Sequence, residues 1–275
     1  MSEPQLLLSG LGIAESVRWH DGRAWVANWG SGEVLAVGAN GDRETVARLS
    51  TNPLPLSFDW LPDGRLLIVD GPQRQLVTQG LDGVGELYAD LSSFGPAPFN
   101  ELVVDAAGNA YVNGGPGLVV VVRPDGSVDQ VADGLQFPNG MALLDGDRTL
   151  VVADSHAKQL VGFDVEPGGG LSGRRVWAAV EHAPDGICAD ADGAIWYASV
   201  PGQRCERVEA GGRVLDTVTL DRGCFACMLG GPDGRTLYIG AAEWLGMDVV
   251  MTQGPGASGG LYAAAGQPAA HAGRP

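Results

Sequence analysis

Short runs of alternating apolar and polar residues recur along the chain, and each run follows a turn that contains Asp and Gly. An apolar or aromatic pair precedes each turn. The six copies begin at Trp19, Trp60, Val104, Leu144, Ala189 and Gly231. They start about 40 to 46 residues apart, a period typical of propeller blades. Because Gly tolerates the positive φ of a tight hairpin, each copy predicts two antiparallel strands.

A second hairpin follows most copies, so each repeat predicts four short strands. Residues 32–37 lead to Asn40-Gly41 in this way, and residues 117–122 lead to the turn at 124–126. A convincing apolar period of 3.6 residues is missing from every segment of about 11 residues or more, which argues against a βαβ fold. The sequence therefore predicts an all-β fold, a six-bladed β-propeller with four antiparallel strands in each blade.

Closure of the ring can be predicted from the last repeat, which supplies about three strands near residues 225–230, 236–241 and 260–264. Residues 5–9 are left over, and we expect this N-terminal strand to complete the last blade. We expect one propeller domain over residues 1–265 and a flexible tail over residues 266–275, which are small, polar and rich in Pro and Gly. The connection 243–259 contains several apolar residues, and it is either a lid over one mouth of the ring or a loop folded onto the last blade.

The charge of the chain narrows the choice of partners. It has 17 Lys and Arg against 33 Asp and Glu, a formal net charge of −16. Such a surface repels nucleic acids and anionic membranes, so we expect neither as a partner, whereas a small molecule or a metal cation fits. The first ten residues lack the basic and long apolar regions of a signal peptide, and long apolar runs are absent, so we expect a cytoplasmic protein. The single lysine, Lys158, among many arginines suggests a bacterial source.

Cysteine usage adds little chemistry. The four cysteines are Cys188, Cys205, Cys224 and Cys227. Cys224 and Cys227 have the spacing of a redox or zinc pair, but a second pair that would complete a four-ligand site is missing. We interpret the cysteines as small buried residues of strands.

Polar residues recur at one position of the blades. In a propeller the first strand of each blade lines the axis, so residues that enter these strands converge at one end of the channel. Counting back from the six turns gives Glu15, Ser57, Phe58, Asp59, Asn100, Glu101, Asn139, Asp185, Phe225 and Cys227. Several supply carboxylate or carboxamide oxygens, which a hard divalent cation would satisfy. Ca²⁺ fits best, Mg²⁺ or Mn²⁺ also fits, and Zn²⁺ is a weaker candidate because histidine and cysteine ligands are few.

The motifs around these positions occur in a characteristic order. They are residues 12–19 with Glu15-Ser16, then Phe99-Asn100-Glu101, Asn139-Gly140, Pro184-Asp185-Gly186 and residues 224–231. Over nearly the whole chain they resemble the SMP-30/gluconolactonase/luciferin-regenerating-enzyme family of six-bladed propellers. The resemblance implies a divalent metal held by Glu15, Asn139 and Asp185, with Asn100 contacting the substrate or a metal-bound water.

Three departures from the family pattern bear on the substrate. Glu101 stands where Asp is usual, Pro98 stands where sugar-lactone members tend to have Arg, and the loop at residues 112–117 is short. These departures favour a substrate less polar than a sugar. Candidate substrate-binding residues are Asn100, Glu101, Phe58, Phe99, Phe137, Phe225 and His182.

The resulting functional hypothesis is metal-dependent hydrolysis of a lactone or similar cyclic ester. The metal would polarise the carbonyl, and Asp185 would act as the general base toward the attacking water. Two alternatives stay open: a phosphotriesterase-like hydrolase, because propellers resembling this one cleave organophosphates, and a metal-stabilised propeller that binds a small molecule without turnover.

Overall fold

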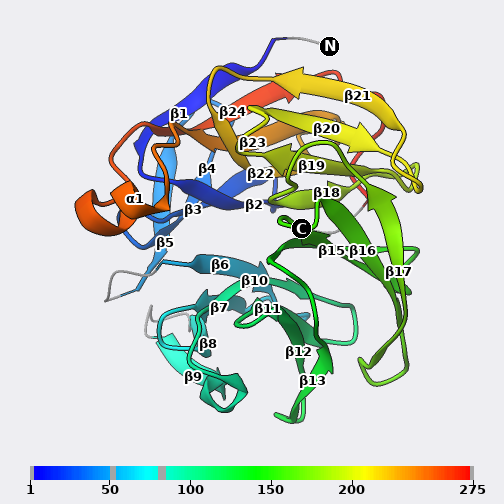
Figure 1. Cartoon of the computed structure of the whole chain (residues 1–275). Coiled ribbons are helices and arrows are strands. Elements are labelled where there is room, and N and C mark those ends of the chain that lie inside the picture. The colour runs from blue at the N-terminus through cyan, green and yellow to red at the C-terminus, as the bar shows by residue number, and fades with distance from the viewer. Residues whose placement is uncertain (1–2, 50–53, 80–84, 273–275) are drawn as a thin grey trace.

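The computed structural model describes residues 3–49, 54–79 and 85–272. Six four-stranded antiparallel sheets are arranged radially around a central axis (Figure 1). The first blade contains β2 (Ala14–His20), β3 (Arg23–Asn28), β4 (Glu33–Val37) and β5 (Arg43–Arg48). The second contains β6 (Leu56–Trp60), β7 (Leu66–Asp70), β8 (Gln75–Gln79) and β9 (Gly85–Asp90). The third contains β10 (Phe99–Val104), β11 (Ala110–Gly114), β12 (Leu118–Val122) and β13 (Val128–Ala132).

The other three blades repeat this plan. The fourth contains β14 (Pro138–Leu144), β15 (Thr149–Asp154), β16 (Gln159–Val165) and β17 (Leu171–Ala179). The fifth contains β18 (Ile187–Ala189), β19 (Ile195–Ser199), β20 (Arg204–Val208) and β21 (Val214–Thr219). The sixth contains β22 (Gly223–Gly230), β23 (Thr236–Ala242), β24 (Gly259–Ala265) and β1 (Gln5–Leu11). The prediction of a six-bladed propeller is confirmed.

The N-terminal strand closes the ring, as the sequence predicts. Strand β1 pairs antiparallel with β24, and Gln5 lies opposite Ala263. The last blade therefore joins residues from both ends of the chain, and the hydrogen bonds between β1 and β24 hold the ring shut.

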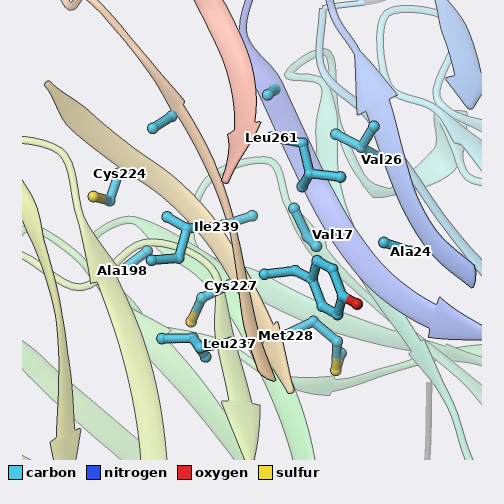
Figure 2. Packing of buried hydrophobic residues seen from close by; sticks show 14 of the residues in the cluster. Val17, Ala24, Val26, Ala198, Cys224, Cys227, Met228, Leu237, Ile239 and Leu261 are labelled. Carbon is cyan, nitrogen blue, oxygen red and sulfur yellow. The ribbon is translucent and has the colours of Figure 1, made fainter. Parts of the chain in front are cut away.

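Burial follows the order of the strands in each blade. Inner and middle strands such as β7 and β12 are buried along their whole length, because neighbouring blades cover both faces, whereas outer strands such as β5 and β9 are largely exposed. Figure 2 shows the cluster where the first, fifth and sixth blades meet, with Val17 and Leu261 packed near Ile239 and Met228. The four cysteines are free and buried, in agreement with the interpretation from the sequence.

Helical structure within the described residues is limited to a 3₁₀ turn, Ser92–Phe94, and to α1 (Met247–Gln253) in the long connection before β24. Val250 of α1 packs against Ile13 and Phe225 in one hydrophobic cluster. The connection is therefore anchored to the last blade and to the start of the first.

Residues 266–272 make backbone contacts with the fifth and sixth blades. The Gln267 N–H donates to Arg235 O at 2.9 Å, and the Ala191 N–H donates to Ala270 O at 2.8 Å. His271 forms an antiparallel bridge with Asp190. Because the tail residues are small, their backbone fits closely against the turns of the fifth and sixth blades. Residues 273–275 lie outside the described residues.

Candidate metal centre

Irregular pairing recurs where the inner strands begin. Strand β2 shifts register between Glu15 and Arg18, β10 between Phe99 and Leu102, β14 between Pro138 and Met141, and β22 between Cys224 and Ala226. A bulge interrupts the alternation of side chains and re-aims the residues within it. Glu15, Asn100, Glu101 and Asn139 all lie at or inside these irregular stretches, so their polar side chains are released from the strict alternation of the blade.

Asp185 reaches the same end of the axis from a turn rather than a strand. It lies two residues before β18, and its N–H donates to Ala198 O at 2.8 Å. The adjacent blade approaches closely, because a Cβ built on Gly140 would lie 2.6 Å from Asp185 O. Gly140 is therefore required for the close packing that brings Asn139 beside Asp185.

Glu15 is buried, and its surroundings disfavour its charge. The adjacent Ser16 has a φ of 48°, and its N–H donates to Glu15 Oε2 at 2.8 Å. Burial raises the pKa of Glu15 from its usual 4.5 to about 8, and the negative charge of Glu101 adds to the increase. A carboxyl group of this kind gains stability from a neighbouring positive charge.

Asp185 and Asn139 form the opposite part of the centre. Burial, followed by the charges of Glu15 and Glu101, raises the pKa of Asp185 well above its usual range, and a hydrogen bond with the Asn139 side chain opposes the shift. Asn100 Nδ2 donates to Asn139 Oδ1 at 3.0 Å. Asp185 Oδ1 is buried and finds no hydrogen-bond partner among the described residues. A buried carboxylate oxygen without a partner is costly, and a cation would supply the missing interaction.

Glu101 is turned toward a guanidinium group. Its Oε1 accepts hydrogen bonds from Arg18 Nη2 at 3.0 Å and from the Leu102 N–H at 2.9 Å. Ser16 Oγ lies 3.4 Å from the same oxygen. Both charged side chains are about 6% exposed. The centre thus combines the carboxyl groups of Glu15, Glu101 and Asp185 with the single guanidinium of Arg18, an excess of acidic groups that fits a divalent cation.

The metal ligands implied by the resemblance include an amide as well as carboxylates. Within the described part of the chain, no three His, Cys, Asp or Glu side chains are arranged as a metal-binding group. The set implied by the resemblance contains two carboxylates, Glu15 and Asp185, and one amide, Asn139. The chemistry of these donors suits Ca²⁺, which prefers oxygen ligands and accepts amide carbonyls.

Asp59 is axial by sequence position, but its oxygens are satisfied locally. Its carboxylate accepts hydrogen bonds from the N–H groups of Trp60 and Val104, both at 2.8 Å. Burial raises the pKa of Asp59 from 3.8 to about 6. The hydrogen bond from the Val104 N–H joins the second blade to the third, so Asp59 has a structural role.

The predicted substrate-binding residues differ in how far they are buried and in what they contact. Phe58 and Phe99 are fully buried between blades, and Phe58 packs edge to face against Trp60. Phe137 is exposed and stacks on a histidine, while Phe225 is buried beneath the long connection. His182 is partly exposed, and its Nε2 lies 3.9 Å from Glu206 Oε1. Asn100 is partly buried beside Asn139.

Sequence reasoning missed two residues of the centre. Arg18 is buried on β2, and its guanidinium donates to Glu101. Asn113 is fully buried on β11, where its Nδ2 donates to Asn139 O. Its position within the apolar run of residues 110–113 was the available signal, because a polar residue in a buried strand needs a partner.

Family membership follows from a comparison with known proteins. The profile of the family described as "SMP-30/Gluconolactonase/LRE-like region" matches residues 13–243. The chain belongs to this family. The match includes Glu15, Asn100, Asn139 and Asp185, and it confirms the resemblance that the motifs indicate.

Similar proteins include a curated relative and several solved structures. Regucalcin of Danio rerio is 33% identical over 174 residues, which cover 61% of this chain and 54% of that protein. This chain therefore spans about half the length of the curated relatives it matches. Regucalcin of Agrobacterium tumefaciens, described as a calcium-binding protein, aligns over 100% of this chain and 96% of that chain with a TM-score of 0.80 at 20% identity. A gluconolactonase of Xanthomonas campestris aligns over 95% and 89% with a TM-score of 0.77 at 20% identity. At such identities the structural likeness shows the fold.

Of the helices in the described residues, none has the length and apolar character that a membrane crossing requires.

Proposed function

We propose that this protein is a divalent-cation-dependent hydrolase that opens a lactone or a similar cyclic ester. The observation that carries the proposal is the buried Asp185 carboxyl, which has an oxygen without a hydrogen-bond partner among the described residues and lies close enough to Glu15 for the charge of Glu15 to raise its pKa. The acidic centre lies at the end of the axis where four inner strands are bulged. Family membership and the gluconolactonase of similar fold support this type of chemistry.

Glu15, Asn139 and Asp185 are the residues we propose to hold the cation, and Ca²⁺ is the ion we expect. The calcium-binding regucalcin of similar fold supports this choice. When bound, the cation would supply Lewis acidity toward the ester carbonyl.

The chain's own residues would position the substrate and move the proton. Asn100 is partly buried beside Asn139, so its amide can orient a substrate at the mouth of the centre. Asp185 is proposed to accept the proton of the attacking water at its carboxylate, which is a general-base role. The Glu101 carboxylate is paired with Arg18, so its proposed part is to maintain the negative charge of the centre.

The test is hydrolysis of aliphatic, aromatic and sugar lactones by the full chain, followed by removal of metal with EDTA and restoration with Ca²⁺, Mg²⁺, Mn²⁺ or Zn²⁺. We expect turnover that EDTA abolishes and Ca²⁺ restores. Asp185→Asn should lose at least about a hundredfold in kcat, since general-base catalysis typically contributes 10²- to 10⁴-fold. Asp133→Asn is the matched control, because Asp133 is an exposed residue that accepts one hydrogen bond from Gln130, and this control should keep full activity.

Two outcomes would overturn the proposal. Full activity of Asp185→Asn would exclude its role as base. Tight Ca²⁺ binding with no turnover of any lactone would instead favour the phosphotriesterase-like or non-catalytic binding alternative.

A further inference from the structure

Two aromatic pairs flank Asp185 on the neighbouring blades. On the fourth blade, Phe137 stacks on His156 with 4.7 Å between ring centroids and 28° between planes. On the sixth, Phe225 meets Trp244 edge to face with a centroid distance of 5.6 Å and an angle of 70°. Asp185 belongs to the fifth blade, which lies between them.

Backbone contacts tie both pairs to the chain around Asp185. Phe225 O accepts a hydrogen bond from the Gly186 N–H at 2.8 Å. Phe137 O accepts one from the Ser155 N–H at 3.0 Å, and Ser155 Oγ donates to Pro184 O at 2.6 Å. Pro184 and Gly186 are the two neighbours of Asp185 in the sequence. The aromatic pairs are therefore fixed beside the acidic centre by contacts with adjacent residues.

Apolar surface remains exposed at this end of the ring. Phe137 is 43% exposed and Trp244 is 37% exposed, and His156, on which Phe137 stacks, is also exposed. Leu245 and Met247, which follow Trp244, are also exposed. Hydrophobic side chains exposed around a candidate active centre are a characteristic of ligand sites.

Two polar side chains near Asp185 already face protein partners. Asn100 Nδ2 donates to Asn139 Oδ1 at 3.0 Å, and His182 Nε2 lies 3.9 Å from Glu206 Oε1. Pro98, next to Phe99, offers no side-chain donor. A polyhydroxylated substrate would need several free donors and acceptors, whereas an apolar substituent would need the aromatic surface that is present.

We propose that the substrate is a lactone with an apolar alkyl or aryl substituent, which lies between Phe137 and Trp244 while the ester faces Asp185. This inference rests on the proposed hydrolase function and specifies its substrate class. Each methylene buried against the two aromatic rings should raise kcat/KM by about fourfold, the value expected for transfer of one methylene out of water.

The experiment measures kcat/KM for γ-lactones whose alkyl substituent grows from none to eight carbons, with gluconolactone as the polar comparison, in excess Ca²⁺. For the wild-type protein we expect a steady rise with chain length and a lower value for gluconolactone. Trp244→Ala and Phe137→Ala should each flatten the rise, so that the ratio between the longest and the unsubstituted lactone falls at least tenfold. Leu87→Ala is the control, because Leu87 is an exposed apolar residue on the outer strand β9, and it should leave the ratio unchanged.

A binding measurement separates this inference from the proposed function. Alkyl-substituted γ-lactams have the same ring and substituent but resist hydrolysis, and their affinity for the wild-type protein and the two variants can be measured by calorimetry. If no lactone is hydrolysed but lactam affinity rises with chain length and falls in Trp244→Ala, the hydrolase proposal fails and the apolar site stands. Rates and affinities independent of chain length, or a preference for gluconolactone, would overturn the inference.

Discussion

Replacement of Arg18 by Met tests whether the buried ion pair beneath the acidic centre supports the fold. Arg18 Nη2 lies 3.0 Å from Glu101 Oε1 and also donates to Leu102 O at 3.0 Å. The substitution keeps much of the apolar stem but removes the charge. Glu101 would then keep only the hydrogen bonds from the Leu102 N–H and the Ser16 hydroxyl, and it would face the carboxyl groups of Glu15 and Asp185 without a counter-charge.

The size of the effect follows from burial. Both side chains of the pair are about 6% exposed, so solvent gives little screening. Removing one partner of a buried pair typically costs about 3 to 5 kcal/mol, because the other charge is left unpaired in a medium of low polarity. For a domain of this size about 1 kcal/mol shifts Tm by roughly 2 to 4 °C, so Arg18→Met should lower Tm by roughly 6 to 20 °C.

The assay is thermal and urea unfolding in EDTA, so that bound cations do not contribute to stability. The double variant Arg18→Met/Glu101→Gln removes both charges and should be more stable than Arg18→Met alone. Arg213→Met breaks an exposed pair with Glu209 and should leave Tm unchanged within experimental error. A loss below about 1 kcal/mol in Arg18→Met, or additive effects in the double variant, would refute the reasoning.

Two further predictions concern pH and backbone packing. Because the pKa of Glu15 is raised to about 8 and that of Asp59 to about 6, the native state without metal binds protons that the unfolded chain has released. Its free energy of unfolding should therefore be highest near about pH 4 and fall as pH rises toward about 8; melts in EDTA that become more stable over this range would contradict the sign. Gly140→Ala would place a Cβ 2.5 Å from Ile187 N and 2.6 Å from Asp185 O, so we expect a loss of about 1 to 3 kcal/mol and weaker Ca²⁺ binding by calorimetry. Gly170→Ala, whose Cβ would have its nearest neighbour at 3.6 Å, is the control, and equal behaviour of the two variants would exclude the packing argument.

The fold was predictable because its signals are local. The Asp-Gly turns select hairpins through the φ angles they tolerate, and their even spacing sets the number of blades. Closure by residues 5–9 followed from a strand missing in the last repeat, and the observed strand covers residues 5–11. The backbone contacts of residues 266–272 were not predictable, because they involve turns of two blades that are distant in the sequence.

The sequence predicted which positions of the chain lie near the candidate site, but it did not predict the directions in which their side chains point. Phe58 and Phe137 each lie within two residues of a predicted axial position, yet Phe58 belongs to the regular strand β6, where alternation directs it into the packing between blades. Phe137 precedes β14 and is free of that constraint. Arg18 was missed for a related reason, because the bulge between Glu15 and Arg18 changes which face the later residues of β2 occupy.

The acidic centre and the closure of the ring depend on each other. Glu15 comes from the first blade, Asn139 from the fourth and Asp185 from the fifth, so only the closed ring brings them together. Closure in turn rests on the pairing of β1 with β24, directly before the strand that holds Glu15. Mutual repulsion of buried carboxyl groups opposes this arrangement, and Arg18 offsets only part of it. A divalent cation held by the three proposed ligands would remove the remaining repulsion and link blades from both halves of the chain, so its binding free energy would also stabilise the closed ring.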